Sequence, residues 1–526
     1  MTLLVLVLFA LLCYSYFSLR LLYSFRKVPA PHWSSRFSSA RILWARWTGT
    51  ELKFLIEAHN RLGPIILVGP QDLSVSSYQD GIRKVYDTGF SKPAPFYSMF
   101  NYYRTRNAFT SLDRSEHGIR RRRTAALYSK SALMQSKHLR EVTDCIIYER
   151  LFPRLESLLV SCGTGRIDGL DLSYRICADY LSSFLFGSCN STNFLSFLSN
   201  GKAELNNDPL KLWRFHYENM SCRESFFVQE MPGLYKLFKA LGTNLLPRKY
   251  SEGTEYIENW MSAMTDKADH TITLKQSKGL NLEAKDEPVV YETTKEAVKK
   301  DSPHLSLEGQ KMQVQSEMFD HVSASREVLG LVFGYALWYL ASHPDAQQKI
   351  HAELEEHKID MTSPIHQDPS GLDRSFRLDS LPYLRAVIDE CLRMRPTSTL
   401  LPRIMPPDRS VSVAGIDNIP PNTRINSFQW FVHRDPTKWE NVNDWDPERW
   451  LSMDRSGKKH DREDVLWPFA SGPRMCLGNH LTYYFMQHVL AAICSRLVLS
   501  ALPRDETQCT PGSPEDEVPI TVVLRA

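Results

Sequence analysis

A ten-residue segment near the C-terminal end constrains the fold more than any other part of the 526-residue chain. It runs from Phe469 to Gly478, reads FASGPRMCLG, and precedes an apolar stretch that predicts a long helix. Gly472 and Gly478 permit a tight turn that can direct backbone N–H groups at the sulfur of Cys476. The start of the helix and the nearby Arg474 favour a deprotonated thiol. The pattern therefore predicts a thiolate ligand held in a turn, and the alternative is a buried structural cysteine.

The rest of the composition excludes several classes of protein. Ten cysteines are too sparse for a disulfide scaffold, and none stands in C-x-x-C spacing, so a zinc knuckle and a thioredoxin-type site are not expected. The net charge of +3 is nearly balanced, which argues against a nucleic-acid-binding protein. No G-x-G-x-x-G motif follows a predicted strand, so the electrons for any redox reaction must come from another protein.

The N-terminal segment from Thr2 to Leu19 contains no charged residue and is rich in Leu, Val, Phe and Tyr. A helix of about 17–25 residues spans a bilayer, and the basic residues Arg20, Arg26 and Lys27 that follow place the rest of the chain in the cytosol. The alternative is a cleaved signal peptide, but a basic start and an A-x-A-like cleavage site are missing. We expect a transmembrane anchor at residues 2–22, a proline-containing hinge at 23–45 and one catalytic domain at 46–526.

Periodicity and breakers predict a mainly helical domain with a small β subdomain. The expected helices lie at residues 315–342, 345–357, 382–395 and 477–498, and the expected strands at 62–70, 410–415 and 520–524. The charged stretch 267–310 has few large apolar residues, and we expect it to be an exposed, flexible insertion.

The segment Phe469–Gly478 resembles the haem-ligand loop of the cytochrome P450 family, F-x-x-G-x-R-x-C-x-G, at every fixed position. The resemblance implies haem b, with the thiolate of Cys476 as the axial ligand of iron. It further implies that Arg474 pairs with a haem propionate and that Phe469, Gly472 and Gly478 shape the cofactor loop. The implied fold is the cytochrome P450 fold, preceded here by the transmembrane helix. The chain is most similar in general character to membrane-anchored fungal members of secondary metabolism, which implies a location in the endoplasmic reticulum membrane.

A second motif resembles the part of the family that supports this loop. Glu390 and Arg393 are three residues apart on a predicted helix, and Arg449 lies in a D-P-E-R-W element similar to the family's P-E-R-F. The resemblance implies that these three residues form a buried charged network. Such a network must be fully paired, because an orphaned buried charge is costly.

Arginines suit the two haem propionates, because guanidinium offers a planar bidentate fork. Arg403 follows the Glu390 helix, as in the family, while His117 and Arg121 occupy the positions of the family's W-x-x-x-R motif. Arg121 belongs to a run of four arginines, 120–123, whose alternative interpretations are a solvated face or a nuclear-import patch. The aromatic residues between 96 and 103 line a substrate pocket or, alternatively, only pack in the core.

The long helix at 315–342 departs from the family pattern A-G-x-(D/E)-T. The chain reads Ala324-Ser325-Arg326-Glu327-Val328, so the acid of the usual acid–alcohol pair remains as Glu327 and the alcohol is lost at Val328. Valine has no hydroxyl and cannot relay a proton. We expect Glu327 to assist proton delivery, with Ser325, a water or a substrate hydroxyl as the relay, unless Val328 only seals the pocket.

Three functional hypotheses follow. The first is a haem monooxygenase that inserts one atom of O₂ into a small, mostly hydrophobic secondary metabolite, with electrons from an NADPH-dependent flavoprotein reductase. The second keeps the haem thiolate but assigns an isomerase, dehydratase or ring-forming oxidase, and Val328 motivates it. The third is a non-enzymatic, membrane-tethered haem-binding protein.

Overall fold

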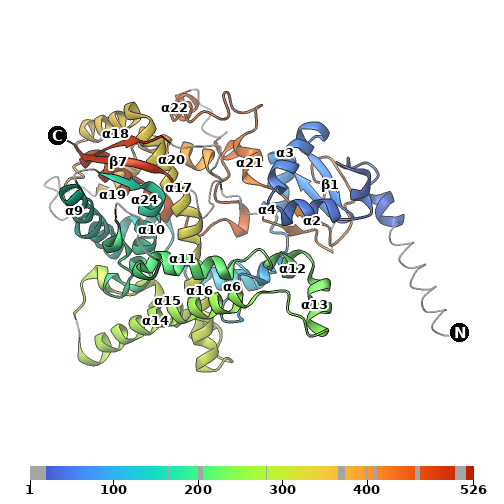
Figure 1. Cartoon of the computed structure of the whole chain (residues 1–526), viewed down its shortest axis with the longest axis horizontal. Coiled ribbons are helices and arrows are strands. Elements are labelled where there is room, and N and C mark those ends of the chain that lie inside the picture. Colours follow the sequence, from blue (N-terminus) through green and yellow to red (C-terminus); the bar gives the residue numbers. More distant parts are fainter. Residues whose placement is uncertain are drawn as a thin grey trace.

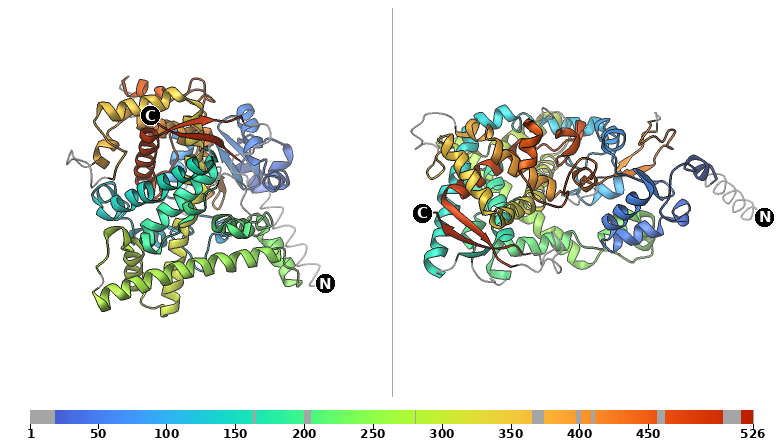
Figure 2. Two further views of the ribbon diagram at one scale, coloured as in Figure 1. Left: turned by 60° about the vertical axis from the view of Figure 1, so that its left-hand side comes forward. Right: turned by 90° about the horizontal axis from the view of Figure 1, so that it is seen from above.

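The computed structural model describes residues 19–162, 165–199, 205–279, 281–364, 374–396, 401–407, 411–455, 462–503 and 517–525. Within these residues the chain is mainly helical, with two small sheets at opposite ends of the molecule (Figures 1 and 2). The expected mainly helical fold with a small β component is therefore confirmed. The expected anchor at 2–22 falls largely outside the described part. None of the helices in the described ranges is both long and apolar enough to cross a membrane.

The N-terminal lobe is built on a four-stranded sheet with the order β1-β2-β5-β4 (Figure 1). Its strands are β1 Ile65–Gly69, β2 Asp72–Val75, β4 Arg403–Ile404 and β5 Arg424–Asn426, and the helices α2 Ala40–Trp47 and α3 Glu51–Leu62 belong to the same lobe. The segment 23–45, expected as a hinge, packs into this lobe: Phe25 and Val28 are buried, and Arg36 donates to both of their carbonyls at 2.9 Å. The sheet matters for function because its edge strand β4 carries Arg403.

The larger lobe is helical and surrounds α10 Gly169–Phe186, in which 16 of 18 residues are buried. Helix α11 Pro209–Met220 lies along α14 Arg248–Lys278, and α24 Asn479–Arg496 runs through the core behind the Cys476 segment. The second sheet, with the order β3-β7-β6, closes the far end (Figure 2). Its strands are β3 Arg166–Asp168, β6 Leu497–Ala501 and β7 Pro519–Leu524.

The other helices complete this lobe and the connection between the lobes. In chain order they are α4 Arg83–Asp87, α5 Ala94–Ser98, α6 Arg114–Arg122, α7 Lys130–Gln135, α8 Lys137–Asp144, α9 Phe152–Cys162, α12 Ser225–Glu230, α13 Pro232–Ala240, α15 Val289–Asp301, α16 Leu307–Ala324, α17 Leu331–Ser342, α18 Pro344–Glu356, α19 Arg374–Asp379, α20 Pro382–Met394, α21 Gln429–His433, α22 Glu448–Arg455 and α23 Arg462–Val465. The expected breaks at Pro344 and Pro382 are confirmed, because each proline occupies the first turn of a helix.

The helix expected at 315–342 is interrupted. Helices α16 and α17 are continuous along one axis, but Ser325–Gly330 between them forms a π-helical turn. A π turn inserts an extra residue into the helical ladder and is frequent at functional sites. It lies where the acid–alcohol pair was expected.

The prediction that 267–310 is an exposed, flexible insertion is wrong. Residues up to Lys278 continue α14, and Val289–Asp301 forms α15, which packs against α10 and α16. The reason is a narrow apolar stripe: Val290, Thr294 and Val298 recur every four residues and are all fully buried. The overall charge of the segment concealed this stripe.

The strand expected at 410–415 is also not formed. In its described part only Val413 pairs, through a single bridge to Ile416, and Ala414 and Gly415 between them both have positive φ. The alternating residues therefore form a tight turn. Gly415 adopts a positive φ without steric cost, which makes the reversal possible.

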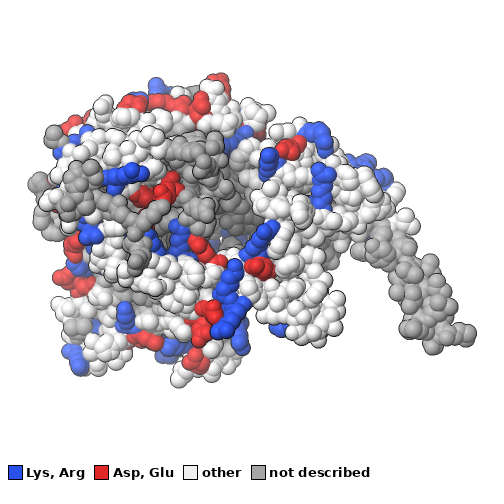
Figure 3. Space-filling model, in the orientation of Figure 1, with Lys and Arg blue, Asp and Glu red and all other residues white. Residues whose placement is uncertain are grey.

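The surface is mixed in charge. On the face in Figure 3, Lys and Arg side chains lie among Asp and Glu over both lobes, as expected for a net charge of +3. This face therefore carries no extended region of one sign.

Candidate active site

The Cys476 segment forms a closed turn at the start of α24. The Cys476 N–H donates to the Phe469 carbonyl at 2.8 Å, and the Met475 N–H donates to the Gly472 carbonyl at 3.0 Å. Gly472 is required here, since its φ is +67° and a Cβ would lie 2.5 Å from the Cα of Asp87. The Phe469 ring packs edge-on against Tyr483 of α24. The turn predicted from the glycines is thus present.

The protonation of Cys476 differs from the expectation. Burial raises the pKa of its thiol above the ordinary value, although the Gly478 N–H and the Arg121 charge lower it. The turn alone therefore does not keep the thiol deprotonated. A coordinated metal ion removes the proton from a cysteine ligand outright, so this sulfur is suited to a bound cation.

The expected support network is confirmed. Arg393 forms a fork on Glu390 at 2.7 and 2.8 Å, and Arg449 Nε reaches the same carboxylate at 3.1 Å. The Trp450 indole N–H and the Asp446 backbone N–H also donate to Glu390, at 3.0 and 2.9 Å. Glu390 and Arg393 are fully buried, and the carboxylate accepts donors from α20, α22 and the loop before α22. This pairing fixes the C-terminal loops relative to α20.

A cluster of basic side chains lies beside the Cys476 turn. Arg474 donates to the carbonyls of Ser111 and Leu112 at 2.7 Å each, and Arg403 donates to the Tyr97 hydroxyl at 2.8 Å. Lys92, which the sequence analysis missed, is buried and donates to the Phe109 carbonyl. A single lysine in an otherwise uncharged stretch, 88–103, was the only sequence signal for it.

The basic side chains of this cluster shift one another's pKa values. Burial and then the charge of Arg403 lower the pKa of Arg474 to about 10, and burial with the same neighbour moves the pKa of Lys92 well below its usual value. Burial, followed by Arg474, Lys92, Arg121 and Arg403, lowers the pKa of His117 to about 3, so its imidazole is neutral. Like charges so close together are stable only if anions join them.

The cluster fits the two propionates of a haem. Arg403 has a buried Nε that forms no hydrogen bond within the described part of the chain, and a further acceptor is needed there. Arg121 donates to the Met475 carbonyl at 2.6 Å, and this contact joins α6 to the Cys476 turn. The donor set on one side and the sulfur on the other therefore suit an anionic, iron-containing cofactor between them.

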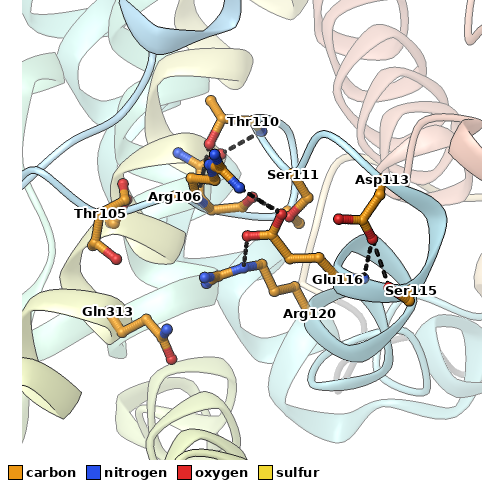
Figure 4. Close-up of polar contacts among 12 residues, drawn as sticks. Thr105, Arg106, Thr110, Ser111, Asp113, Ser115, Glu116, Arg120 and Gln313 are labelled. Atoms are coloured by element: carbon orange, nitrogen blue, oxygen red, sulfur yellow. Dashed lines mark hydrogen bonds and ion pairs between the residues drawn. The ribbon is translucent and has the colours of Figure 1, made fainter. Parts of the chain in front are cut away.

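The four arginines 120–123 divide between different partners. Arg120 and Arg123 each reach Glu317 of α16 at 3.1 Å, and Arg123 also pairs with Asp301 at 2.8 Å. Arg122 is exposed. Figure 4 shows Glu116 of α6 between Arg106 and Arg120, with Asp113 capping the start of the helix. The solvated-face and nuclear-import interpretations are therefore wrong for three of the four arginines.

The residues expected on the long helix are only partly visible. The side chains of Ser325 and Glu327 lie outside the described part, so their expected roles remain predictions. Val328 is described and partly accessible; Asp320, eight residues before it, is also partly accessible, and Ala324, four residues before it, is exposed. The sequence analysis missed Asp320, although Glu317, Asp320 and His321 are three ionisable residues in a helix of the core, which was a usable signal.

The aromatic residues near 100 are mainly packing residues. Tyr97 and Tyr102 are buried at 0% and 3% exposure, and Tyr102 packs on Phe319 of α16 with ring centroids 4.2 Å apart. Phe100 packs edge-on against Phe109. For the two tyrosines, the core interpretation is therefore the correct one.

Comparison with known proteins agrees with this geometry. A family model described as "Cytochrome P450" matches residues 41–518. A cytochrome P450 monooxygenase of Aspergillus oryzae is 24% identical over 463 residues, which cover 86% of this chain and 82% of that protein. A tryptophan 6-hydroxylase of Fusarium equiseti is 25% identical over 524 residues (93% and 89%), and a fusicoccadiene C-8 hydroxylase of Phomopsis amygdali is 24% identical over 475 residues (89% and 83%). The likeness extends along nearly the whole of each chain.

Proposed function

The chain belongs to the cytochrome P450 family, and from this we propose that it oxidises a small, mostly hydrophobic secondary metabolite with electrons from an NADPH-dependent flavoprotein reductase. Membership of the family makes the protein a haem b enzyme with a cysteine thiolate ligand and a monooxygenase. The single observation that carries the proposal is the Cys476 turn with the basic side chains of Arg121, Arg474 and Arg403 beside it.

Each residue of the site has a distinct role. Haem, when bound, supplies the activation of O₂, and a thiolate ligand favours O–O cleavage by donating electron density to iron. Cys476 would hold the iron, while Arg403, Arg474 and neutral His117 would hold the propionates. Arg121 fixes α6 to the cysteine turn through the Met475 carbonyl. The Glu390 network keeps this turn in place from the side of α20.

The substrate is proposed from the class of relatives alone. One similar protein is named for tryptophan and another for fusicoccadiene, so the substrates of similar proteins differ widely. Both names describe hydroxylation. This supports hydroxylation of a carbon-rich molecule and leaves its skeleton open.

The deciding experiment is turnover under ¹⁸O₂ with the full chain, a flavoprotein reductase and NADPH, using hydrophobic probes that shift the haem Soret band. We expect one ¹⁸O atom in the product and none when only the water is labelled. Product without label would favour the isomerase, dehydratase or ring-forming alternative that Val328 motivates. A protein whose NADPH oxidation no probe stimulates would be a haem-binding protein without enzymatic activity.

Substitution of Val328 by threonine tests the role of the missing hydroxyl. The variant is expected to increase the share of NADPH electrons that reach product by up to about tenfold, less than the roughly 10²–10⁴ of a positioned proton donor, because other donors already serve. The measurement is product formed per NADPH consumed. Val328→Ala, which changes the volume without adding a hydroxyl, is the control. Equal coupling in all three proteins would refute the relay argument.

We further propose a single-pass anchor in the endoplasmic reticulum membrane with the catalytic domain in the cytosol. Large apolar side chains are exposed near the start of the described chain, namely Leu19, Tyr23, Trp33 and Phe37, and on α13 and at its C-terminal cap, namely Leu237 and Leu241. Figure 1 places α13 at the same end of the molecule as the start of the described chain. Removal of residues 2–22 is expected to shift the protein from the membrane fraction to the supernatant while haem is retained. An unchanged membrane fraction would contradict the anchor.

A further inference from the structure

One face of α16 remains accessible inside an otherwise buried helix. Between Gln313 and Ser323 every residue is buried except Asp320 and His321, and Ala324 in the next turn is exposed. Asp320, Ala324 and Val328 are spaced by four residues, which places them above one another on the same side of a helix. Helix α16 packs against α10, α14 and α15 in the helical lobe. This face is therefore left uncovered by the helices that bury the rest of α16.

Asp320 on this face lies near Cys476. Burial raises the pKa of the Tyr128 phenol, and the charges of Cys476 and Asp320 add to the effect, so both groups lie near this ring. Asp320 is also near enough to affect the Cys476 thiol directly. Both Asp320 and Cys476 retain accessible surface although the surrounding protein desolvates them strongly. Asp320 is therefore an accessible carboxyl group near the cysteine turn.

The neighbouring acid Glu317 has a different role. It is buried, it pairs with Arg120 and Arg123, and its second oxygen accepts the Ala108 N–H at 2.9 Å. All of these contacts hold α16 to α6 and to the loop before it. Glu317 is thus fully used by the fold and is not available to a ligand.

Asp320, by contrast, has free acceptor capacity. The Phe109 N–H lies within hydrogen-bonding reach, and no Lys or Arg of the described chain forms an ion pair with it. Lys92 acts on it only from a distance and is bonded to the Phe109 carbonyl. His321 beside it is neutral, because burial lowers its pKa to about 4, and it contacts the Tyr128 hydroxyl at 2.6 Å. A carboxylate offers about four acceptor sites, so most of those on Asp320 are open.

Asp320 can be protonated or charged near neutral pH. Burial, followed by the charge of Glu317, raises its pKa to about 7, against the opposing effects of Lys92 and the Phe109 N–H. The charged form of such a desolvated carboxyl group is stabilised most by a positively charged partner, because burying a charge is costly unless it is paired.

We propose that Asp320 is a specificity-determining residue that binds a positively charged nitrogen of the substrate. The natural substrate is then a hydrophobic molecule with a basic amine, held by Asp320 while another part of it faces the iron. This inference rests on the proposed function, since it names the substrate class of the same site.

Binding of two matched probes to the ferric holoenzyme tests the proposal by equilibrium dialysis. Benzyltrimethylammonium carries a fixed positive charge and has no lone pair to ligate iron, and neopentylbenzene is its neutral carbon isostere. The unaltered protein is expected to bind the cation more tightly. Asp320→Asn should weaken binding of the cation about 10- to 100-fold, the range for loss of an interaction with a charged group. The affinity for the neutral probe should stay within about twofold of its original value. Asp320→Glu should restore part of the preference.

The control variant is Asp113→Asn, the same chemical change at the exposed cap of α6, where asparagine also caps well. This variant should leave the affinity for both probes unchanged. Equal losses for the two probes in Asp320→Asn would show that Asp320 only holds the loop at Phe109, and an unchanged cation affinity would equally overturn the proposal. Dialysis needs neither electrons nor O₂, so failure of the proposed monooxygenation would appear separately, as missing ¹⁸O in the product.

Discussion

Replacement of Cys476 by alanine is expected to abolish the red-shifted Soret band of the reduced, carbon monoxide-bound protein. The band depends on a thiolate ligand, and Cys476 is the only described cysteine in the turn beside the basic cluster, since most of the other described cysteines are buried elsewhere. Turnover should fall by several orders of magnitude, because the thiolate assists O–O cleavage. The spectrum is measured in membranes together with the total haem content.

The matched control is Cys494→Ala on α24, the helix that follows the turn. Cys494 is fully buried, and burial raises the pKa of its thiol, as in a structural cysteine. Loss of this small side chain should cost about 1 kcal/mol and leave the spectrum intact. A red-shifted band that persisted in well-folded Cys476→Ala would remove Cys476 as the iron ligand.

Replacement of Glu390 by alanine should produce the second large effect, on stability. The change leaves Arg393 and Arg449 without their carboxylate, and Arg393 is fully buried. Breaking a buried ion pair by removal of one partner costs about 3–5 kcal/mol. We expect the free energy of unfolding to fall by this amount and the haem content to fall with it, because the network holds the loops around the cysteine turn.

Urea titration followed at the Soret band measures the effect. Glu448→Ala in the same region is the control, since Glu448 forms an exposed pair with Lys349 at 2.8 Å. Exposed pairs contribute about 0–1 kcal/mol. If both variants lost the same small amount, the Glu390 network would not be a support of the site.

Prediction from sequence succeeded where the determining residues are close together in the chain. The turn at Cys476 depends on Gly472, and Glu390 and Arg393 meet within one helical turn. The helix starts at Pro344 and Pro382 are equally local, because proline fixes its own φ and removes one donor. Such features follow from steric and hydrogen-bonding rules over a few residues.

Prediction failed where the average character of a segment concealed a few decisive positions. The charged stretch 267–310 forms the end of α14 and all of α15, because a few buried positions, among them Val290, Thr294 and Val298, attach α15 to the core. In the same way, the run of four arginines at 120–123 did not show which of them pair inside the protein, and the structure gives them different environments. The helical rotation of about 100° per residue, and not residue type, separates them.

The sequence by itself determined the family, the cofactor and its ligand, since all three depend on one contiguous motif whose chemistry is local. Only the tertiary structure decided which charges pair and which remain free for a ligand. Arg123 and Glu317 are 194 residues apart and meet because the end of α6 lies against α16, and this contact satisfies Glu317 while Asp320, one turn further on, keeps accessible surface. Whether a charge is paired depends on which helices pack together, and that is a property of the whole fold.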